Sequence, residues 1–302
     1  MPVQIQTYRP TLNSGQIYLK NTTIAGPKIA VGNVSALSLE ISEEEKTLTD
    51  YTAPGGGQWA ALSRVSGINA SMTLHDLDPI NLSRAIYGDT SDTVAGSATG
   101  ETHTAYQGGL IRLAKPAPTS VVVTSDAGAW ASATAYTEGD FISDGTDLQE
   151  CTTAGTSAGT EPTWETTTGA TTSDGTVTWT NRGAFAAVAD TDYEVRPEGL
   201  MILGGGIPDG CPISVAYSYG AYSAIEALTA GSGIYELSFG GLNEANSNSP
   251  VILDIWRLQI SAASNLGFIS DDFASLEVTG TVLMDSTKTG SGISKYFRVQ
   301  MV

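Results

Sequence analysis

The sequence predicts a mainly β protein: a β-sandwich or rolled sheet with one short α-helix and a small inserted β-domain. Two observations indicate this class. Thr, Ser, Gly and Ala are abundant, while charged residues make up only 15% of the 302 residues, a composition that favours strands and turns. Apolar and polar residues also alternate with a period of two along several segments, which is typical of half-exposed strands.

The first predicted elements are three strands and one long loop. Alternating apolar residues predict strands over 16–19, 34–41 and 62–74. The stretch 43–57 lies between the second and third strands and combines three glutamates with Pro54 and a triple glycine. Proline and glycine interrupt regular structure, so this stretch is predicted to be a loop.

A short helix is predicted directly after the third strand. Asp78 is a suitable N-cap, and Pro79 fits the first helical position. Leu82 and Ile86 are four residues apart, so they lie on one face of a helix, and Gly88 is a suitable terminator. The helix is expected to cover one face of the sheet.

The middle of the chain is predicted to hold an inserted domain. Strand patterns continue over 102–113 and 121–124, and the composition then changes over 129–183, which has three tryptophans, eight acids and no lysine. If that segment is removed, 121–124 leads into 190–195 as a hairpin, and 197–219 resumes the alternation. Insertions are tolerated at surface turns. The predicted domains are therefore 1–128 with 184–302, and an insert at 129–183.

Three strands are predicted near the carboxyl end. Residues 234–241 and 274–284 alternate strictly, whereas 251–260 begins apolar on both faces and is expected to be covered on both sides. The polar face of the last strand carries hydroxyls and one carboxylate: Ser275, Glu277, Thr279 and Thr281.

The charge balance argues against a nucleic-acid-binding protein. The net charge is −18, and phosphate contacts need clustered lysine and arginine. Residues 116–220 alone contain 14 acids and 2 arginines. The acidity has two interpretations: it keeps DNA from adhering to a surface, or it simply keeps the protein soluble.

Neither a catalytic nor a metal site is predicted. His75 and His103 are each expected to be exposed or packed, and no catalytic or phosphate-binding motif is present. Cys151 and Cys211 are expected to be free thiols, since their spacing fits no metal motif. No cofactor is expected, and no segment predicts a membrane span or a secretion signal.

Two long segments resemble the tail tube proteins of long-tailed, non-contractile bacteriophages. The first is FGGLNEANSNSPVILDIWRLQISAASNLGFISDDFASLEVTGTVLMD, followed by SKYFRVQMV at the end of the chain. The second is DPINLSRAIYGDTSDTVAGSATGETHTAYQGGLIRL, and the resemblance covers about two thirds of the chain. It implies a virion structural protein, made in the bacterial cytoplasm, whose rings of six copies stack into a tube for genomic DNA.

That resemblance also implies partners and surfaces. The partners are further copies of the chain and the tail tip, terminator and tape-measure proteins, while DNA passes without specific binding. The strands are expected to join an inner β-barrel shared by the copies, with a lumen lined by Glu236, Ser275, Glu277, Thr279 and Thr281. The loop containing Glu43, Glu44, Glu45 and Tyr51 is the candidate contact between stacked rings, with a solvated turn as the alternative.

The insert resembles small carbohydrate-binding modules of the chitin-binding type. The resemblance rests on AWASATAYTEGD, on Cys151, and on the tryptophans of PTW and DGTVTW. Leu148 departs from the pattern, because those modules have an aromatic residue there. The candidate residues for glycan binding are Trp130, Tyr136, Trp164 and Trp179, and the alternative is that they form the core of a small domain.

Three other functions remain open from the sequence. The chain could be a capsid or tail decoration or adhesion protein whose aromatic insert binds surface carbohydrate. It could be a ring subunit of a contractile injection machine. A carbohydrate-active enzyme is the third alternative, although the adjacent Asp271 and Asp272 would face opposite ways on a strand.

Overall fold

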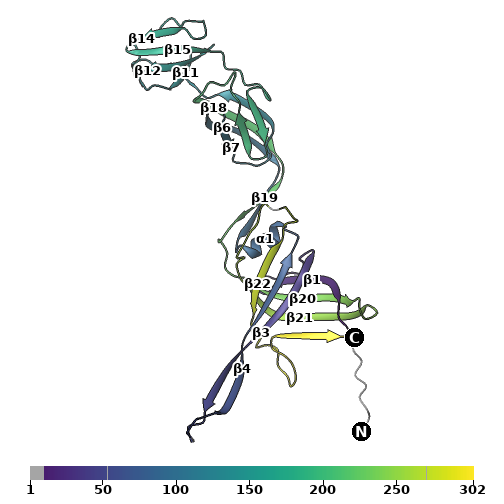
Figure 1. The fold of residues 1–302 in the computed structure, drawn as a ribbon. Helices are drawn as coiled ribbons and strands as arrows, with labels where there is room; N and C mark the ends of the chain where they lie inside the picture. The colour runs from purple at the N-terminus through teal and green to yellow at the C-terminus, as the bar shows by residue number, and fades with distance from the viewer. Residues whose placement is uncertain (1–9, 53, 270) are drawn as a thin grey trace. The chain divides into compact units, whose positions relative to one another are not determined.

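The computed structural model describes residues 10–52, 54–269 and 271–302 and divides the chain into two compact units. Unit 1 contains the chain up to Ser91 together with Ser223–Val302, and unit 2 contains Asp92–Tyr222. Both are built from β-strands, and one short helix is present in the described residues, which confirms the predicted fold class. Figure 1 shows the strands and this helix. None of the described residues belongs to a helix with the length and apolarity needed for a membrane span.

Unit 1 is organised around one antiparallel sheet of eight strands. The order is β2-β1-β20-β21-β22-β4-β3, and β23 pairs with the first half of β21. These strands are β1 (Asn13–Asn21), β2 (Ile29–Ala30), β3 (Val34–Thr49), β4 (Gln58–Leu74), β20 (Ile234–Asn243), β21 (Ser249–Ile260), β22 (Leu276–Val282) and β23 (Phe297–Met301).

The core of unit 1 lies between the two halves of this sheet. In Figure 1, β22, β4 and β3 cross the direction of β1, β20 and β21. Each half contributes its apolar face to one buried cluster, which includes Leu19 and Leu237 from one half and Met72, Leu276 and Val278 from the other. The predicted sandwich or rolled sheet is therefore a single sheet that folds over its own core.

The predicted helix is present as α1 (Pro79–Ala85). The Asp78 carboxylate accepts a hydrogen bond from the Asn81 backbone amide at 2.7 Å, and Pro79 occupies the first turn. Ala85 is fully buried in the core of unit 1. The local capping signals thus specified the start of the helix. The buried face is the one with Asn81 and Ala85, whereas the predicted pair Leu82 and Ile86 is only half-buried.

Strand β21 differs from the prediction that both its faces are covered. Val251, Ile255 and Leu258 are buried, whereas Ile252 is 40% exposed and Trp256 is half-buried. One face packs on the core, and the other forms part of the surface of unit 1. Its apolar residues are therefore not evidence of a second covering layer within one chain.

Unit 2 contains two three-stranded sheets that share a core. The first has the order β6-β18-β8 and the second β16-β17-β7. Their strands are β6 (Gly96–Ala105), β7 (Leu110–Arg112), β8 (Thr119–Ser125), β16 (Tyr193–Arg196), β17 (Gly199–Ile202) and β18 (Cys211–Tyr219). A short pair, β5 (Asp89–Thr93) with β19 (Tyr222–Glu226), lies where the chain passes between the units.

The predicted hairpin between 121–124 and 190–195 is wrong. Strand β8 pairs with β18, and β16 pairs with β17. The reason is local: Arg196 lies opposite Gly199, so a two-residue turn brings β16 directly against β17. The predicted strand 102–113 is likewise divided into β6 and β7 by a turn in which Gly108 has φ of 74°.

The segment 129–183 has a sheet and a small buried cluster of its own, and it also contributes two side chains to the larger core of unit 2. Its five-stranded sheet has the order β14-β15-β12-β11-β9, and β10 pairs with β13. Phe141 and Leu148 pack with Cys211 in the larger core of unit 2. The two compact units divide at 92 and 222, so 129–183 lies within unit 2, and its being an inserted domain stays a prediction. These strands are β9 (Gly128–Ala129), β10 (Ala135–Tyr136), β11 (Phe141–Ser143), β12 (Leu148–Thr153), β13 (Gly155–Thr156), β14 (Thr171–Asp174) and β15 (Val177–Gly183).

Candidate assembly surfaces

The outer parts of β3 and β4 form an exposed two-stranded ribbon, which we call the hairpin arm (residues 42–66). Strand β22 pairs with β4 only from Asn69 onward, so the arm extends beyond the sheet (Figure 1). Residues 43–49 and 54–66 are all exposed. An isolated two-stranded ribbon is marginally stable in water. Within the part of the chain that the structure describes, the arm therefore lacks the support that a third strand or a core would provide.

The prediction of a loop over 43–57 is wrong for its first half. Glu43, Glu44 and Glu45 lie in β3, and the connecting segment is 50–57. Cross-strand pairing explains the difference, because Glu44 lies opposite Arg64, an opposite-charge pair that favours the ladder. Tyr51 is in the connecting segment and is 84% exposed.

The arm exposes several large apolar side chains. Exposed fractions between 52% and 63% are found for Ile41 at its base and for Leu48, Trp59, Leu62 and Val65 along it. Soluble monomers rarely expose such a concentration of apolar surface, which instead marks sites of protein association. The arm is thus a candidate surface for contact with another protein chain.

Unit 1 also has open sheet edges. Within the described residues β3 pairs with β4 alone, and β23 pairs with β21 alone. Unpaired edges present free backbone donors and acceptors to other strands. Both edges are therefore candidate sites for pairing with another strand.

Three of the five predicted lumen residues share one surface. Glu277, Thr279 and Thr281 are exposed on β22 and line a shallow groove of about 370 Å³. The same face continues across β4 and β3, where the Ser38 and Ser71 hydroxyls are 2.7 Å apart. The surface is therefore hydroxyl-rich with few charges.

The other two predicted lumen residues lie elsewhere. Ser275 is exposed but precedes β22. Glu236 is on β20, where its carboxylate forms an ion pair with Lys28 Nζ at 2.8 Å. Since β20 belongs to the other half of the folded sheet, Glu236 does not line the groove that contains Glu277.

The aromatic residues of 129–183 form a small core. Trp179 is fully buried, and the rings of Tyr136 and Trp164 meet it edge-on with centroids 4.8 and 6.1 Å away. The Nε1 atoms of Trp130 and Trp179 both donate to Asp174, at 2.7 and 3.1 Å. The prediction that Trp179 contacts a glycan is therefore wrong, because its ring is buried in the core of this segment. A small domain needs a large side chain in its core to be stable. Trp130, Tyr136 and Trp164 are half-buried, and glycan binding by them stays a prediction.

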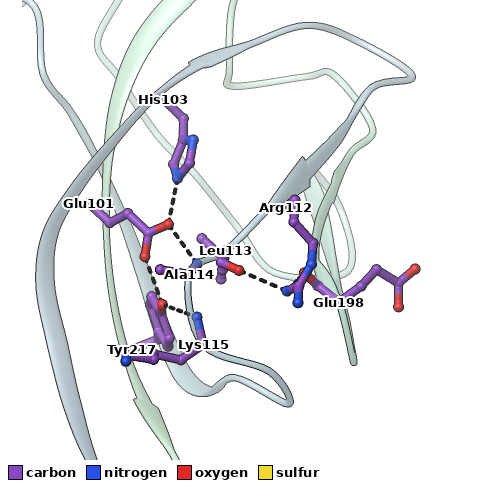
Figure 2. A network of polar contacts seen from close by, with 8 residues as sticks. All are labelled: Glu101, His103, Arg112, Leu113, Ala114, Lys115, Glu198 and Tyr217. Atoms are coloured by element: carbon purple, nitrogen blue, oxygen red, sulfur yellow. Dashed lines mark hydrogen bonds and ion pairs between the residues drawn. The ribbon is translucent and has the colours of Figure 1, made fainter. Parts of the chain in front are cut away.

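Sequence reasoning missed a polar network in unit 2 (Figure 2). The Glu101 carboxylate accepts hydrogen bonds from Tyr217 Oη at 2.7 Å, the Ala114 amide at 2.9 Å and His103 Nε2 at 3.0 Å. Tyr217 Oη in turn accepts from the Lys115 amide at 3.1 Å. The network ties β6 and β18 to the segment after β7. The sequence contained one indication of this network: Glu101 and His103 are two positions apart, so both lie on the same face of a strand.

Electrostatics in this network favour a charged Glu101. Burial alone would raise the pKa of Glu101, but the three hydrogen bonds outweigh it, and the net effect lowers that pKa. Burial and the hydrogen bond to Glu101 raise the pKa of Tyr217 to about 12. His103 is thus held by a carboxylate within a structural network, consistent with its predicted packing role.

Comparison with known protein families gives a match over most of the chain. A family model described as "Protein of unknown function UCP028589" matches residues 10–158 and 142–300, which together cover both units. No curated protein matches the sequence.

Proposed function

This chain belongs to the protein family of unknown function UCP028589, and we propose that it is a structural subunit of a bacteriophage tail tube. In this proposal, copies of the chain form rings that stack into a hollow conduit for DNA ejection. The observation that carries the proposal is the hairpin arm, in which residues 43–49 and 54–66 are all exposed. Such an element is best explained by a binding site on another copy.

The open edges of unit 1 support ring formation. A neighbour that pairs with β3 or β23 would remove an exposed edge, and pairing around a ring would close the sheet into a common barrel. The two edges differ in sequence, so the contact is head-to-tail. Contacts of this kind generate rings when the rotation between copies closes.

The hydroxyl-rich face of β22 and β4 is proposed to line the lumen. Glu277, Thr279 and Thr281 offer no cation to phosphate, and the −18 net charge disfavours adhesion of DNA. Glu236 is left out of this lining because it lies with Lys28 on the other half of the sheet. The proposed location is the virion tail, with tail tip, terminator and tape-measure proteins as further partners.

Electron microscopy of the purified protein tests the proposal. Hollow tubes or rings are expected for the natural chain, and none for Leu62→Ser/Val65→Ser, which removes exposed apolar groups from the arm. Val122→Ser is a matched control, because Val122 is equally exposed (56%) but lies in unit 2. A natural chain that stays monomeric at all concentrations, or arm variants that form normal tubes, would contradict the proposal.

A further inference from the structure

The two faces of the hairpin arm differ in charge. Residues directly opposite each other in an antiparallel pair share a face. Glu43 lies opposite Val65 and Glu45 opposite Ser63, and because they are two positions apart, both glutamates point to the same side. We call this the acidic face (Glu43, Glu45, Ser63 and Val65). It carries two carboxylates and no cation.

The other face of the arm carries two cations and one carboxylate. Glu44 lies opposite Arg64, and Lys46 Nζ is 3.8 Å from the Glu44 carboxylate. The carboxylates of the acidic face have no cationic partner. The Gln58 side-chain amide donates a hydrogen bond to the Glu45 carboxylate at 3.4 Å. Within the described residues, no ion pair involves Glu43 or Glu45. The acidic face is therefore the one that suits a cationic partner.

A groove with the complementary character lies on the outer face of β20 and β21. It has a volume of about 270 Å³, and we call it the basic groove, lined by Thr22, Glu236, Trp256, Arg257, Asp285, Thr287 and Lys288. Lys288 Nζ is 4.1 Å from the centre of the Trp256 ring, and Arg298 Cζ is 5.3 Å from it. Tryptophan and arginine are the residues most enriched at the energetic centres of protein interfaces.

Around the groove, the cations (Lys28, Arg257, Lys288 and Arg298) exceed the carboxylates (Glu236, Asp254 and Asp285) by one, in an otherwise acidic chain. Two carboxylates at or near the groove already form ion pairs: Glu236 with Lys28, and Asp254 with Arg298. Asp285 is engaged by the backbone amide and hydroxyl of Thr287. Lys288 and Arg257 are close enough to Asp285 to help lower its pKa, after the hydrogen bonds from Thr287, but no ion pair in the described part of the chain includes either cation. Four of the chain's 14 cations therefore gather at this groove.

We propose that the acidic face of the arm of one copy binds in the basic groove of a second copy. This rests on the proposed self-assembly and names the two surfaces that meet. Charge complementarity selects the acidic face over the other face, which has a net positive charge, and Val65 brings an apolar side chain to the Trp256 ring. Because arm and groove are different surfaces, the contact is head-to-tail and extends from copy to copy.

A charge exchange tests this contact. Glu43→Lys/Glu45→Lys and Arg257→Glu/Lys288→Glu are each expected to raise the protein concentration needed for assembly at least tenfold. The chain with all four substitutions has the natural net charge and is expected to assemble again. A 1:1 mixture of the two double variants should also assemble, since each supplies the surface that the other lacks. Circular dichroism checks that each variant folds.

Two controls separate specific pairing from net charge and from the broader proposal. Adding Lys20→Glu and Lys115→Glu to the Glu43/Glu45 variant restores the net charge but is expected not to restore assembly. If the natural chain forms tubes and the double variants assemble normally, the contact is refuted while the tail tube proposal stands. Failure of the four-substitution chain to assemble would also refute it. A natural chain that never assembles refutes both.

Discussion

At the scale of single residues, two carboxylates of unit 2 are each satisfied by several convergent hydrogen bonds. Asp174 is 1% exposed, and its carboxylate accepts from two indoles and from the Ala158 amide at 2.8 Å. The Glu101 carboxylate likewise accepts hydrogen bonds from Tyr217, His103 and the Ala114 amide. In each case one carboxylate fixes several segments that are distant in the sequence, so its loss leaves several donors without an acceptor.

Removal of the Asp174 carboxylate is expected to destabilise unit 2. Asp174→Ala leaves the buried Trp179 indole without an acceptor, and we expect a loss of about 2–4 kcal/mol in the free energy of unfolding. Urea unfolding followed by tryptophan fluorescence measures it. Glu138→Ala is the control, because Glu138 is exposed in the same segment. Equal stability of the two variants would contradict this account of Asp174.

Glu101 is expected to make stability depend on pH. Its pKa is lowered in the folded chain, so its contribution is present above the unfolded-state pKa of about 4.3 and is lost as pH falls through the folded-state pKa. Glu101→Gln should cost about 1–3 kcal/mol at pH 7, and the difference from the natural chain should shrink below about pH 4. Guanidinium unfolding at a series of pH values checks this, with the exposed Glu194→Gln as control. A difference that is constant with pH would exclude the charged form as the cause.

At the scale of elements, the same strand has two different environments. The inner part of β4 alternates buried and exposed residues, with Ile68, Ala70, Met72 and Leu74 in the core. Its outer part, 58–66, is exposed throughout. One continuous strand therefore belongs partly to the core of unit 1 and partly to a surface that we propose is covered only on assembly.

Backbone hydrogen exchange should distinguish these two parts. In the monomer, amides of 43–49 and 58–66 are expected to exchange far faster than those of 68–74, because the arm has no core beneath it. In assembled protein, protection of the arm is expected to rise at least a hundredfold. Exchange measured by mass spectrometry before and after assembly gives both values. Equal protection of the arm in the two states would show that assembly leaves it uncovered.

At the scale of the whole molecule, the two units have separate cores. Unit 2 is a continuous stretch, Asp92–Tyr222, and both cysteines are buried within it as free thiols. Burial raises the pKa of Cys211 to about 12, and it also raises the pKa of Cys151. Neither thiol is therefore a reactive thiolate at neutral pH.

The excised fragment 92–222 is expected to fold by itself. It contains two of the three buried clusters and three tryptophans that report on packing. We expect cooperative urea unfolding and two thiols that react with a disulfide reagent at pH 8 only after denaturation. Immediate reaction of both thiols in buffer would show that unit 2 needs unit 1 for its fold. The full chain under the same conditions is the reference.

The sequence by itself determined the features that depend on neighbouring residues: the strand alternation in 62–74, the Asp78 cap of α1 and the mainly β class. It also marked Glu277, Thr279 and Thr281 as one polar face. Only the tertiary structure decided which strands pair, that Glu236 lies apart from that face, and that Trp179 is interior. The physical reason is that a two-residue period identifies the two faces of a strand but not the strand or core that each face meets.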